Sequence, residues 1–258
     1  MSDENRGITI KGSDTILPLS QKHAEVFGNI NRTTRLVATG GGSGSGFVSL
    51  IEGKTDIAMA SRKINLAERN ALQQGDDEVK EVVIAYDALA IIVNVSNKVN
   101  QLNREQIEAI FTGKIANWNE VGGDDLKIVV YDRDVNSGTY EFFKEHVLNN
   151  KNYGSQVLSL PASSAIIQSV GENKGAIGYV GLAYLENTIK PLRISFNQKN
   201  RFVAPSMATA KDKSYPIIRP LYYYYLASNE ANLKPFIDFV LSAAGQKDVR
   251  EIGYVPLK

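Results

Sequence analysis

The stretch RDVNSGTYEFF, residues 133–143, lies where an apolar run changes into a helical pattern. Residues 126–131 before it predict a strand, and apolar residues at helical spacing follow it. Ser137, Gly138 and Thr139 are therefore expected at the first turn of a helix, where backbone N–H groups lack intrahelical partners and carry the positive end of the dipole. Two hydroxyls, a glycine that permits close approach and an arginine nearby favour the binding of a small oxyanion. The alternative interpretation is an ordinary serine N-cap beside a surface arginine.

Composition bounds the class of protein. The chain has 258 residues, of which 43% are hydrophobic and 22% charged, and this suits one large domain or two lobes. A net charge of +1 gives no electrostatic footprint for nucleic acid or an anionic membrane. The absence of cysteine excludes disulfides, thiolate metal sites and thiol nucleophiles, and it is compatible with an extracytoplasmic location. Residues 1–6 are polar and lack the apolar core of a signal peptide, so we expect a tail from which a leader or anchor was removed.

Predicted strands and helices alternate along the whole chain, and this pattern indicates an α/β fold with mainly parallel sheets. Two long apolar runs, residues 79–95 and 215–226, stand out from the short strands. At about 3.3 Å per residue, each run is long enough to cross from one lobe to another. No apolar run in the sequence approaches the roughly 20 residues that are needed to span a bilayer.

Hydroxyl, glycine and arginine residues recur at four predicted strand ends. These ends carry Ser13-Asp14-Thr15, Ser43-Gly44-Ser45, Ser61-Arg62, and Arg133 with Ser137-Gly138-Thr139. Ligands of open α/β sheets bind outside the carboxyl ends of strands, close to helix N-termini. We therefore expect the four junctions to share one anion site.

The glycine-rich segment 40–46 is interpreted as the anion-binding loop of the second junction, with a flexible linker as the alternative. Its glycines lack the G-x-G-x-x-G spacing of a dinucleotide fingerprint. Gly53-Lys54-Thr55 is not a P-loop, because Val48 occupies the position of the leading glycine and the segment ends a helix.

At this point the chain resembles a known family, the phosphate-binding proteins of bacterial phosphate ABC transporters. The four junction motifs occur in that family's order, and residues 110–118 and 215–221 are also typical of it. The resemblance covers essentially the whole chain, and the Arg-x-x-x-Ser-Gly-Thr element at 133–139 is its most specific part. It implies a two-lobed periplasmic-binding-protein fold of the second type, with two mixed, mainly parallel sheets joined by two crossing strands.

The resemblance also implies an organisation and a function. Residues 1–87 and 197–258 would form the first lobe and 88–196 the second, with phosphate bound in the cleft between them. The protein would be an extracytoplasmic monomer without enzymatic activity, metal or cofactor, which delivers phosphate to the permease subunits of the transporter and does not bind nucleic acid. The implied ligands are Ser13, Asp14, Thr15, Ser43, Gly44, Ser45, Ser61, Arg62, Arg133, Ser137, Gly138 and Thr139.

Selectivity needs an acceptor as well as donors, because phosphate near neutral pH carries at least one proton and sulfate carries none. Some family members have an aspartate at the position of Arg62, so the acceptor must come from elsewhere. We hypothesise that Asp14, at a helix start, is that acceptor, with Asp134 and Asp87 as fallbacks. The alternative is that Asp14 caps its helix and pairs with Arg62.

Three other functions are kept open. A phosphate-ester hydrolase would need a nucleophile with a base, or metal carboxylates. Only His23 and His146 are present, and both are interpreted as structural or surface residues. A binding protein for sulfate, arsenate or molybdate, and a phosphate scavenger or adhesin without a transporter, use the same kinds of residue.

Overall fold

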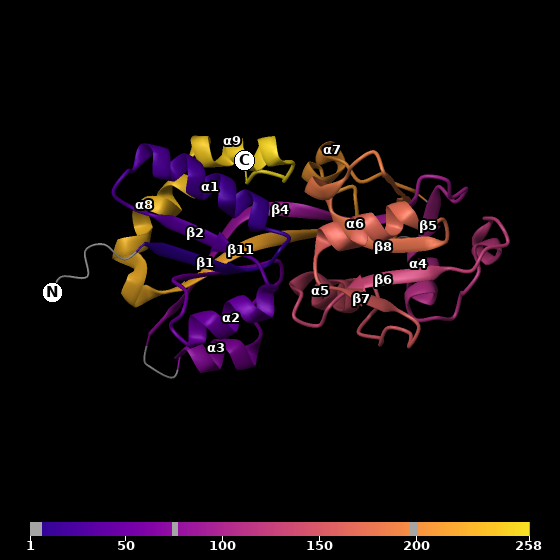
Figure 1. The fold of residues 1–258 in the computed structure, drawn as a ribbon, viewed down its shortest axis with the longest axis horizontal. Coiled ribbons are helices and arrows are strands. Elements are labelled where there is room, and N and C mark those ends of the chain that lie inside the picture. Colours follow the sequence, from indigo (N-terminus) through magenta and orange to yellow (C-terminus); the bar gives the residue numbers. More distant parts are fainter. Residues whose placement is uncertain (1–6, 74–76, 197–200, 258) are drawn as a thin grey trace. The chain divides into compact units, whose positions relative to one another are not determined.

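Strands and helices alternate along the chain in the computed structural model, which describes residues 7–73, 77–196 and 201–257 (Figure 1). The described residues form two compact units. Unit 1 falls within Met1–Tyr86, Asn136–Gly138 and Pro220–Lys258, and unit 2 within Asp87–Val135 and Thr139–Arg219. The polar segment 1–6 lies outside the described residues. No helix in the described part of the chain is long and apolar enough to cross a membrane.

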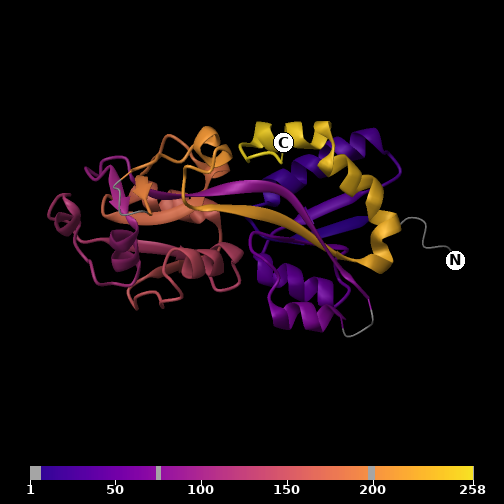
Figure 2. The ribbon, with the colours of Figure 1, turned by 180° about the vertical axis from the view of Figure 1, so that it is seen from behind.

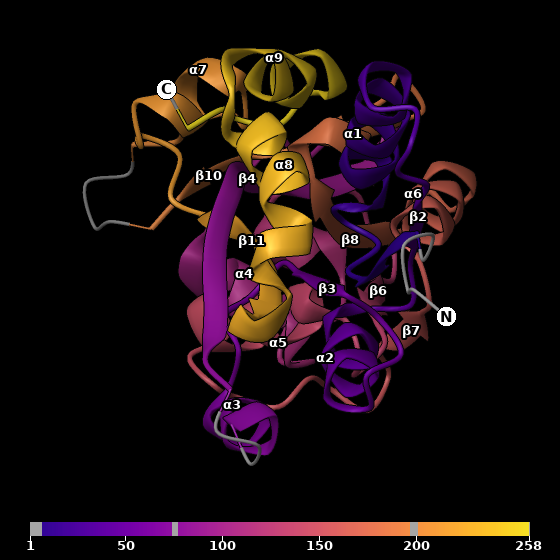
Figure 3. The same ribbon diagram turned by 90° about the vertical axis from the view of Figure 1, so that its left-hand side faces the viewer.

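Unit 1 is a mixed sheet with helices on both faces. Its strands are β1 (Ile8–Gly12), β2 (Leu36–Thr39), β3 (Ile57–Ala60), the first half of β4 (Val79–Asn94) and most of β11 (Ile218–Leu226), in the order β2-β1-β3-β11-β4. β1 pairs in parallel with β2 and β3, and β11 is antiparallel to β3. Its helices are α1 (Leu17–Ile30), α2 (Ser43–Ile51), α3 (Leu66–Leu72), α8 (Glu230–Leu241) and α9 (Ala243–Ile252). Figures 1 and 3 show α2 and α3 on one face of the sheet, with α1, α8 and α9 on the other.

Four consecutive tyrosines on β11 fill both faces of this sheet. Tyr222 and Tyr224 pack with Phe47 of α2, whereas Tyr223 stacks on Phe236 of α8, because successive side chains of a strand point to opposite faces. The sequence predicted a mixture of core and rim for Tyr222–Tyr225. All four are buried, since helices cover both faces of the sheet.

Unit 2 repeats the mixed architecture. Its sheet has the order β4-β8-β6-β7, with β9 paired to β4. The strands are β6 (Val129–Arg133), β7 (Leu158–Leu160), β8 (Ala176–Gly181), β9 (Ile189–Pro191) and the second half of β4, and a separate parallel pair joins β5 (Gln101–Asn103) to β10 (Arg193–Ser195). The helices are α4 (Arg104–Phe111), α5 (Gly138–His146), α6 (Ser163–Glu172) and α7 (Met207–Lys211), and short 3-10 turns occupy Trp118–Val121, Leu182–Tyr184 and, in unit 1, Ala227–Asn229.

The sheet of unit 2 is also covered on both faces. Val180 of β8 faces the apolar side of α6, and the neighbouring Tyr179 faces an aromatic cluster. In that cluster Phe143 stacks on Tyr179 with 4.1 Å between ring centroids and lies 4.7 Å from Phe111. Trp118, which the sequence predicts to be a packing residue, is buried, and its indole N–H donates to the carbonyl of Gly175 at 2.9 Å, so this prediction is confirmed.

β4 and β11 are the two strands that continue from one unit into the other (Figure 2). They coincide with the apolar runs 79–95 and 215–226, so the predicted mixed α/β fold with two crossing strands is confirmed. The strand order runs through β4 as one hydrogen-bonded path instead of two separate sheets, because the 16 residues of β4 contribute to both units.

The unit boundaries differ from the predicted lobes at three places, of which the smallest is Asp87, the first residue of unit 2. Residues 201–219 belong to unit 2, where Val203 bridges to Ile194 and the Tyr215 hydroxyl donates to the Leu89 carbonyl at 3.0 Å. Asn136–Gly138 belong to unit 1, since the N–H of Gly44 donates to the Asn136 carbonyl. The remainder of the predicted loop 197–214, residues 197–200, lies outside the described residues.

Three predicted element limits are wrong. The strand expected at 126–131 is β6 at Val129–Arg133, so Arg133 is the last residue of a strand. The glycine-rich segment is a loop only to Gly42, where α2 begins. The apolar spacing of residues 233–244 predicts one helix that Gly245 ends, but Ser242 separates α8 from α9 and Gly245 lies in the first turn of α9.

Gly245 brings α9 close to the end of α8 and to α1. A Cβ there would lie 2.3 Å from the carbonyl oxygen of Phe239, so only glycine fits without a backbone shift. The carbonyl of Gly245 lies 3.0 Å from Nε2 of His23, whose ring is fully buried on α1 and meets Phe239 edge-on. Burial lowers the pKa of His23 from 6.5 to about 4, against the opposing effect of the Gly245 carbonyl.

We predict that His23→Gln flattens the dependence of stability on pH between about 4 and 6.5. The folded ring takes up a proton only near pH 4 and the unfolded ring near 6.5, so the unfolded chain binds more protons in this window. Stability therefore falls as the pH falls, by about 3 kcal/mol in total. Urea unfolding at several pH values measures the slope. His146→Gln, which changes an exposed histidine, is the control, and an unchanged slope in His23→Gln would contradict the assignment.

Candidate functional site

The carboxyl ends of β1 and β3 bring two serines together in unit 1. The strands are parallel with Gly12 opposite Met59, so the residues that follow leave the sheet at the same edge. There the Ser13 hydroxyl donates to the Ser61 hydroxyl at 3.0 Å, and both side chains are buried. Two of the four predicted junctions thus meet.

The N-terminus of α2 reaches the same two strands. The Ser43 hydroxyl, in the first residue of α2, accepts a 3.1 Å hydrogen bond from the N–H of Ser61. Gly46, one turn later, packs directly on β1: a Cβ there would lie 2.6 Å from the Lys11 carbonyl. Gly46 thus permits close packing of α2 on β1.

The two other predicted ligands of this segment are engaged within unit 1. The N–H of Gly44 donates to the carbonyl of Asn136 at 3.0 Å. The Ser45 hydroxyl donates to the carbonyls of Gly41 and Gly42, at 2.6 and 2.9 Å. Ser45 thus stabilises the loop that precedes α2. The binding of a ligand by Gly44 and Ser45 stays a prediction.

Gly138, the first residue of α5, closes the cluster of serines. A Cβ at Gly138 would lie 2.3 Å from the Ser43 hydroxyl oxygen and 2.9 Å from that of Ser61. The backbone at the start of α5 is therefore in contact with both hydroxyls, and Ser137 beside it is buried as well. Each of the four predicted junctions contributes one residue to a buried place in unit 1, which we call the hydroxyl cluster: Ser13, Ser43, Ser61 and the backbone of Gly138.

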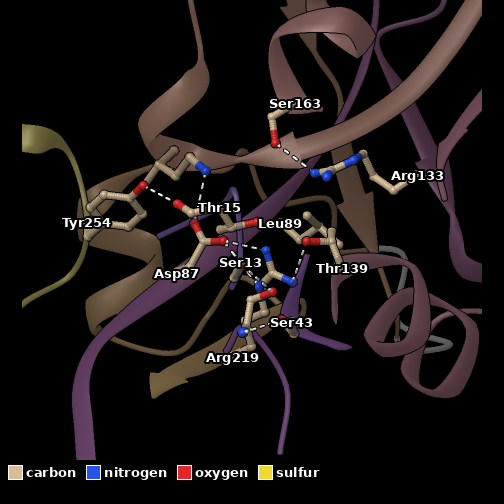
Figure 4. Close-up of polar contacts among 12 residues, drawn as sticks. Ser13, Thr15, Ser43, Asp87, Leu89, Arg133, Thr139, Ser163, Arg219 and Tyr254 are labelled. Atoms are coloured by element: carbon tan, nitrogen blue, oxygen red, sulfur yellow. Dashed lines mark hydrogen bonds and ion pairs between the residues drawn. The ribbon is translucent and has the colours of Figure 1, made fainter. Parts of the chain in front are cut away.

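Asp14 lies beside this cluster and is partly buried. Its Oδ1 accepts a 3.0 Å hydrogen bond from the N–H of Gly41, and a Cβ at Gly40 would be only 2.2 Å from the same oxygen. The N-cap residue of α1 is Ile16, so Asp14 does not occupy the N-cap position of that helix. The side chain of the neighbouring Thr15 is buried, and its carbonyl accepts from the hydroxyl of Tyr254 (Figure 4).

Arg62 has a partner that the sequence did not indicate. Both terminal nitrogens of its guanidinium donate to the carboxylate of Glu68, at 2.8 and 2.7 Å, and the group lies 5.0 Å from the Phe47 ring centroid. Glu68 also accepts from the N–H of Asn65 in the capping box of α3. The spacing Asn65-x-x-Glu68 was a readable cap signal. The guanidinium of Arg62 already binds the carboxylate of Glu68 through both terminal nitrogens. Direct binding of an anion by Arg62 therefore stays a prediction.

In unit 2, Arg133 ends β6 with 2% of its side chain exposed. Its Nη1 donates to the hydroxyl of Ser163, the first residue of α6, at 3.2 Å (Figure 4). Its Nη2 donates to the carbonyl of Pro161 at 2.7 Å. These bonds hold the guanidinium in one orientation at a strand end. Its burial satisfies the sequence expectation that Arg133 is not a surface arginine.

Thr139 is buried in unit 2 against an arginine that the sequence analysis did not select. Nη1 of Arg219 donates to the Thr139 hydroxyl at 3.0 Å, and Nη2 and Nε donate to Oδ2 of Asp87 at 2.9 and 3.2 Å (Figure 4). Burial raises the pKa of Asp87, and the guanidinium of Arg219 opposes that rise. The two hydrogen bonds from Arg219 make Asp87, one of the fallback acceptors, the partner of a buried arginine. The sequence carries a signal for this pair: Arg219 is a single arginine inside the apolar run 215–226, and a buried arginine needs a partner.

Among the described residues, no group of three or more His, Asp or Glu side chains could hold a metal ion. A cavity of about 190 Å³ in unit 2 is lined by residues that were not predicted as ligands. They are Ser96, Asn97, Lys98, Trp118, Asp124, Leu126 and Lys174. The fallback acceptor Asp134 follows β6 and is partly buried.

Comparisons with known proteins agree with the fold and with these motifs. A profile of the PBP superfamily domain matches residues 2–244. Protein SphX of Synechococcus elongatus is 33% identical over 262 residues, which cover 97% of this chain and 77% of that protein. The phosphate-binding protein PstS of Staphylococcus aureus is 34% identical over 255 residues, covering 95% of this chain and 76% of that protein.

Solved structures give the same result. A putative phosphate ABC transporter substrate-binding protein from Clostridium perfringens, with bound phosphate, has a TM-score of 0.87 and 33% identity, covering 98% of this chain and all of that one. An ABC-type phosphate transport receptor from Vibrio cholerae has a TM-score of 0.78 and 29% identity, covering 96% and 99%. The chain therefore belongs to the PBP superfamily and, within it, to the phosphate-binding proteins of bacterial phosphate ABC transporters.

Proposed function

We propose that this protein binds inorganic phosphate and delivers it to the permease of an ABC transporter. The observation that carries the proposal is the hydroxyl cluster of unit 1, built from two parallel strand ends and two helix N-termini. Serine hydroxyls and the first N–H groups of a helix are donors suited to a small oxyanion. The relatives support phosphate as the anion, because one neighbour of 33% identity holds bound phosphate.

Each unit carries proposed ligands of its own. Unit 1 would supply the hydroxyl cluster and Ser137 as donors. Its Asp14 would act as an acceptor, because its carboxylate can take a hydrogen bond from the proton of phosphate. Unit 2 would supply Arg133 and Thr139, which its own contacts hold in place. Buried hydrogen-bond donors and a buried guanidinium favour an anion that is removed from water, since charge-assisted hydrogen bonds are about twice as strong as neutral ones.

The proposal includes an extracytoplasmic location and binding without turnover. A serine nucleophile would need a general base, and His23 cannot serve as one because it is enclosed in the core between α1 and α9. Incubation with p-nitrophenyl phosphate should release no p-nitrophenol above the buffer rate. Measurable hydrolysis would show a phosphatase instead.

We predict that phosphate binds the purified protein with one-to-one stoichiometry and that Arg133→Ala weakens binding by about 2–5 kcal/mol, as expected for loss of a buried charged partner. Isothermal titration calorimetry with phosphate, arsenate and sulfate measures both. Arg193→Ala is the control, because Arg193 lies exposed on β10 of the same unit. A loss of less than about tenfold for Arg133→Ala would show that Arg133 is not a phosphate partner.

Gly138→Ala should weaken phosphate binding by roughly 1–3 kcal/mol, the usual cost of overpacking, because the new methyl group overlaps the hydroxyls of Ser43 and Ser61. Gly28→Ala is the control: a Cβ at Gly28 on α1 meets no atom within 4 Å. Calorimetry and thermal unfolding of both variants separate lost binding from lost stability. Unchanged affinity in Gly138→Ala would place the phosphate elsewhere.

Asp14→Asn should reduce the ratio of phosphate to sulfate affinity by about tenfold or more, because the carboxylate accepts a phosphate proton and repels fully ionised sulfate. Competition of each anion against labelled phosphate near neutral pH gives the ratio. Glu52→Gln removes one exposed charge from the same unit and should leave the ratio unchanged. An equal ratio in Asp14→Asn and wild type would remove Asp14 as the acceptor.

A further inference from the structure

The buried pair of Asp87 and Arg219 lies where both crossing strands enter unit 2. Asp87 on β4 and Arg219 on β11 are the terminal residues of unit 2 on these strands, and both side chains are fully buried. Isolated burial of either charge costs several kcal/mol, so the two must be matched closely by hydrogen bonds. Their contacts show what the pair holds in place.

Asp87 is fixed from two directions. One carboxylate oxygen, Oδ2, accepts from Nε and Nη2 of Arg219, and the other, Oδ1, accepts from the N–H of Leu182 at 3.1 Å. Gly181 packs against the carboxylate, since a Cβ there would lie 2.8 and 2.9 Å from its two oxygens. The carboxylate therefore orients the guanidinium from one side and has no room to move toward β8.

The other side of the guanidinium faces the first turn of α5. Its Nη1 donates to the Thr139 hydroxyl at 3.0 Å, and its central carbon lies 5.5 Å from the ring centroid of Phe142, three residues further along the same helix face. Arg219 thus fastens the start of α5 to β11 through one polar and one aromatic contact.

The chemistry of this bond sets the direction of the Thr139 hydroxyl. A guanidinium can only donate, so Thr139 Oγ1 must be the acceptor, and its single proton is turned away from Arg219. A hydroxyl that accepts from a cation also becomes a stronger donor, because linked hydrogen bonds polarise one another. The contact therefore makes Thr139 a directed donor.

We propose that Arg219, oriented by Asp87, is a positioning residue for phosphate binding that acts through the hydroxyl of Thr139. The inference rests on the proposed function and deepens it, because it names the group that aims a ligand donor at the anion. Arg219 contributes little net charge here, since its carboxylate partner neutralises it at 2.9 Å.

A double-mutant cycle on phosphate affinity tests the inference. Arg219→Lys keeps the charge but lacks the planar fork that reaches Asp87 and Thr139 together. Thr139→Val removes the hydroxyl and keeps the shape. We expect Arg219→Lys to weaken phosphate binding by about tenfold and Thr139→Val by about ten- to hundredfold. The double variant should bind phosphate within about twofold of Thr139→Val alone, because the hydroxyl that Arg219 orients is already absent from that variant.

Two further variants guard the interpretation. Tyr215→Phe removes another buried hydrogen bond of unit 2, from the Tyr215 hydroxyl to the Leu89 carbonyl. It should lower the unfolding temperature yet leave phosphate affinity within about twofold, so lost stability alone does not imitate the effect. Asp87→Asn keeps an acceptor for the Leu182 N–H and loosens Arg219, and it replaces Arg219→Lys in the cycle if that variant fails to fold.

The outcomes separate the inference from the function beneath it. Non-additive losses in the cycle, with unchanged binding by Tyr215→Phe, support positioning through Thr139. Additive losses, or failure of both pair variants to fold, overturn positioning and leave the pair as a structural one, while wild-type phosphate binding still upholds the function. Wild-type protein that binds none of phosphate, arsenate or sulfate overturns both.

Discussion

The parallel pairing of β1 with β3 is the constraint on which the hydroxyl cluster depends. Backbone register places Gly12 opposite Met59, so Ser13 and Ser61 emerge side by side where the sheet ends. The sheet edge is also where the helices that follow the strands begin, and their first N–H groups need partners outside the helix. Strand register and helix polarity thus place hydroxyls and amides together before any side chain adds specificity.

Glycine makes this arrangement dense enough to be selective. Gly46 lets α2 lie on β1, and Gly138 lets the start of α5 touch two serine hydroxyls. A methyl group at either place would meet backbone or hydroxyl atoms closer than 3.0 Å. The benefit is that backbone amides can approach a ligand closely, and the cost is the extra conformational entropy that glycine loses on folding.

Each unit pairs one buried arginine with a carboxylate. In unit 1 the buried Arg62 is matched by Glu68, and in unit 2 Arg219 is matched by Asp87, so neither guanidinium is an uncompensated buried charge. Arg133 in unit 2 donates to the hydroxyl of Ser163 and to the carbonyl of Pro161, and these bonds orient its guanidinium. An oriented guanidinium is suited to charge-assisted hydrogen bonds with an anion, as the proposed function requires.

The sequence by itself determined the class of fold, the crossing runs that became β4 and β11, and the strand-end positions of Ser13, Ser61 and Ser137, because hydrophobic period and turn chemistry are local properties. Only the tertiary structure decided which partners the charged residues take. Arg62 meets Glu68 six positions along the chain, and Arg219 meets Asp87, 132 positions away, since burial forces each cation toward a carboxylate that folding brings near. Helix limits such as the break at Ser242 were likewise set by packing, which local propensity does not contain.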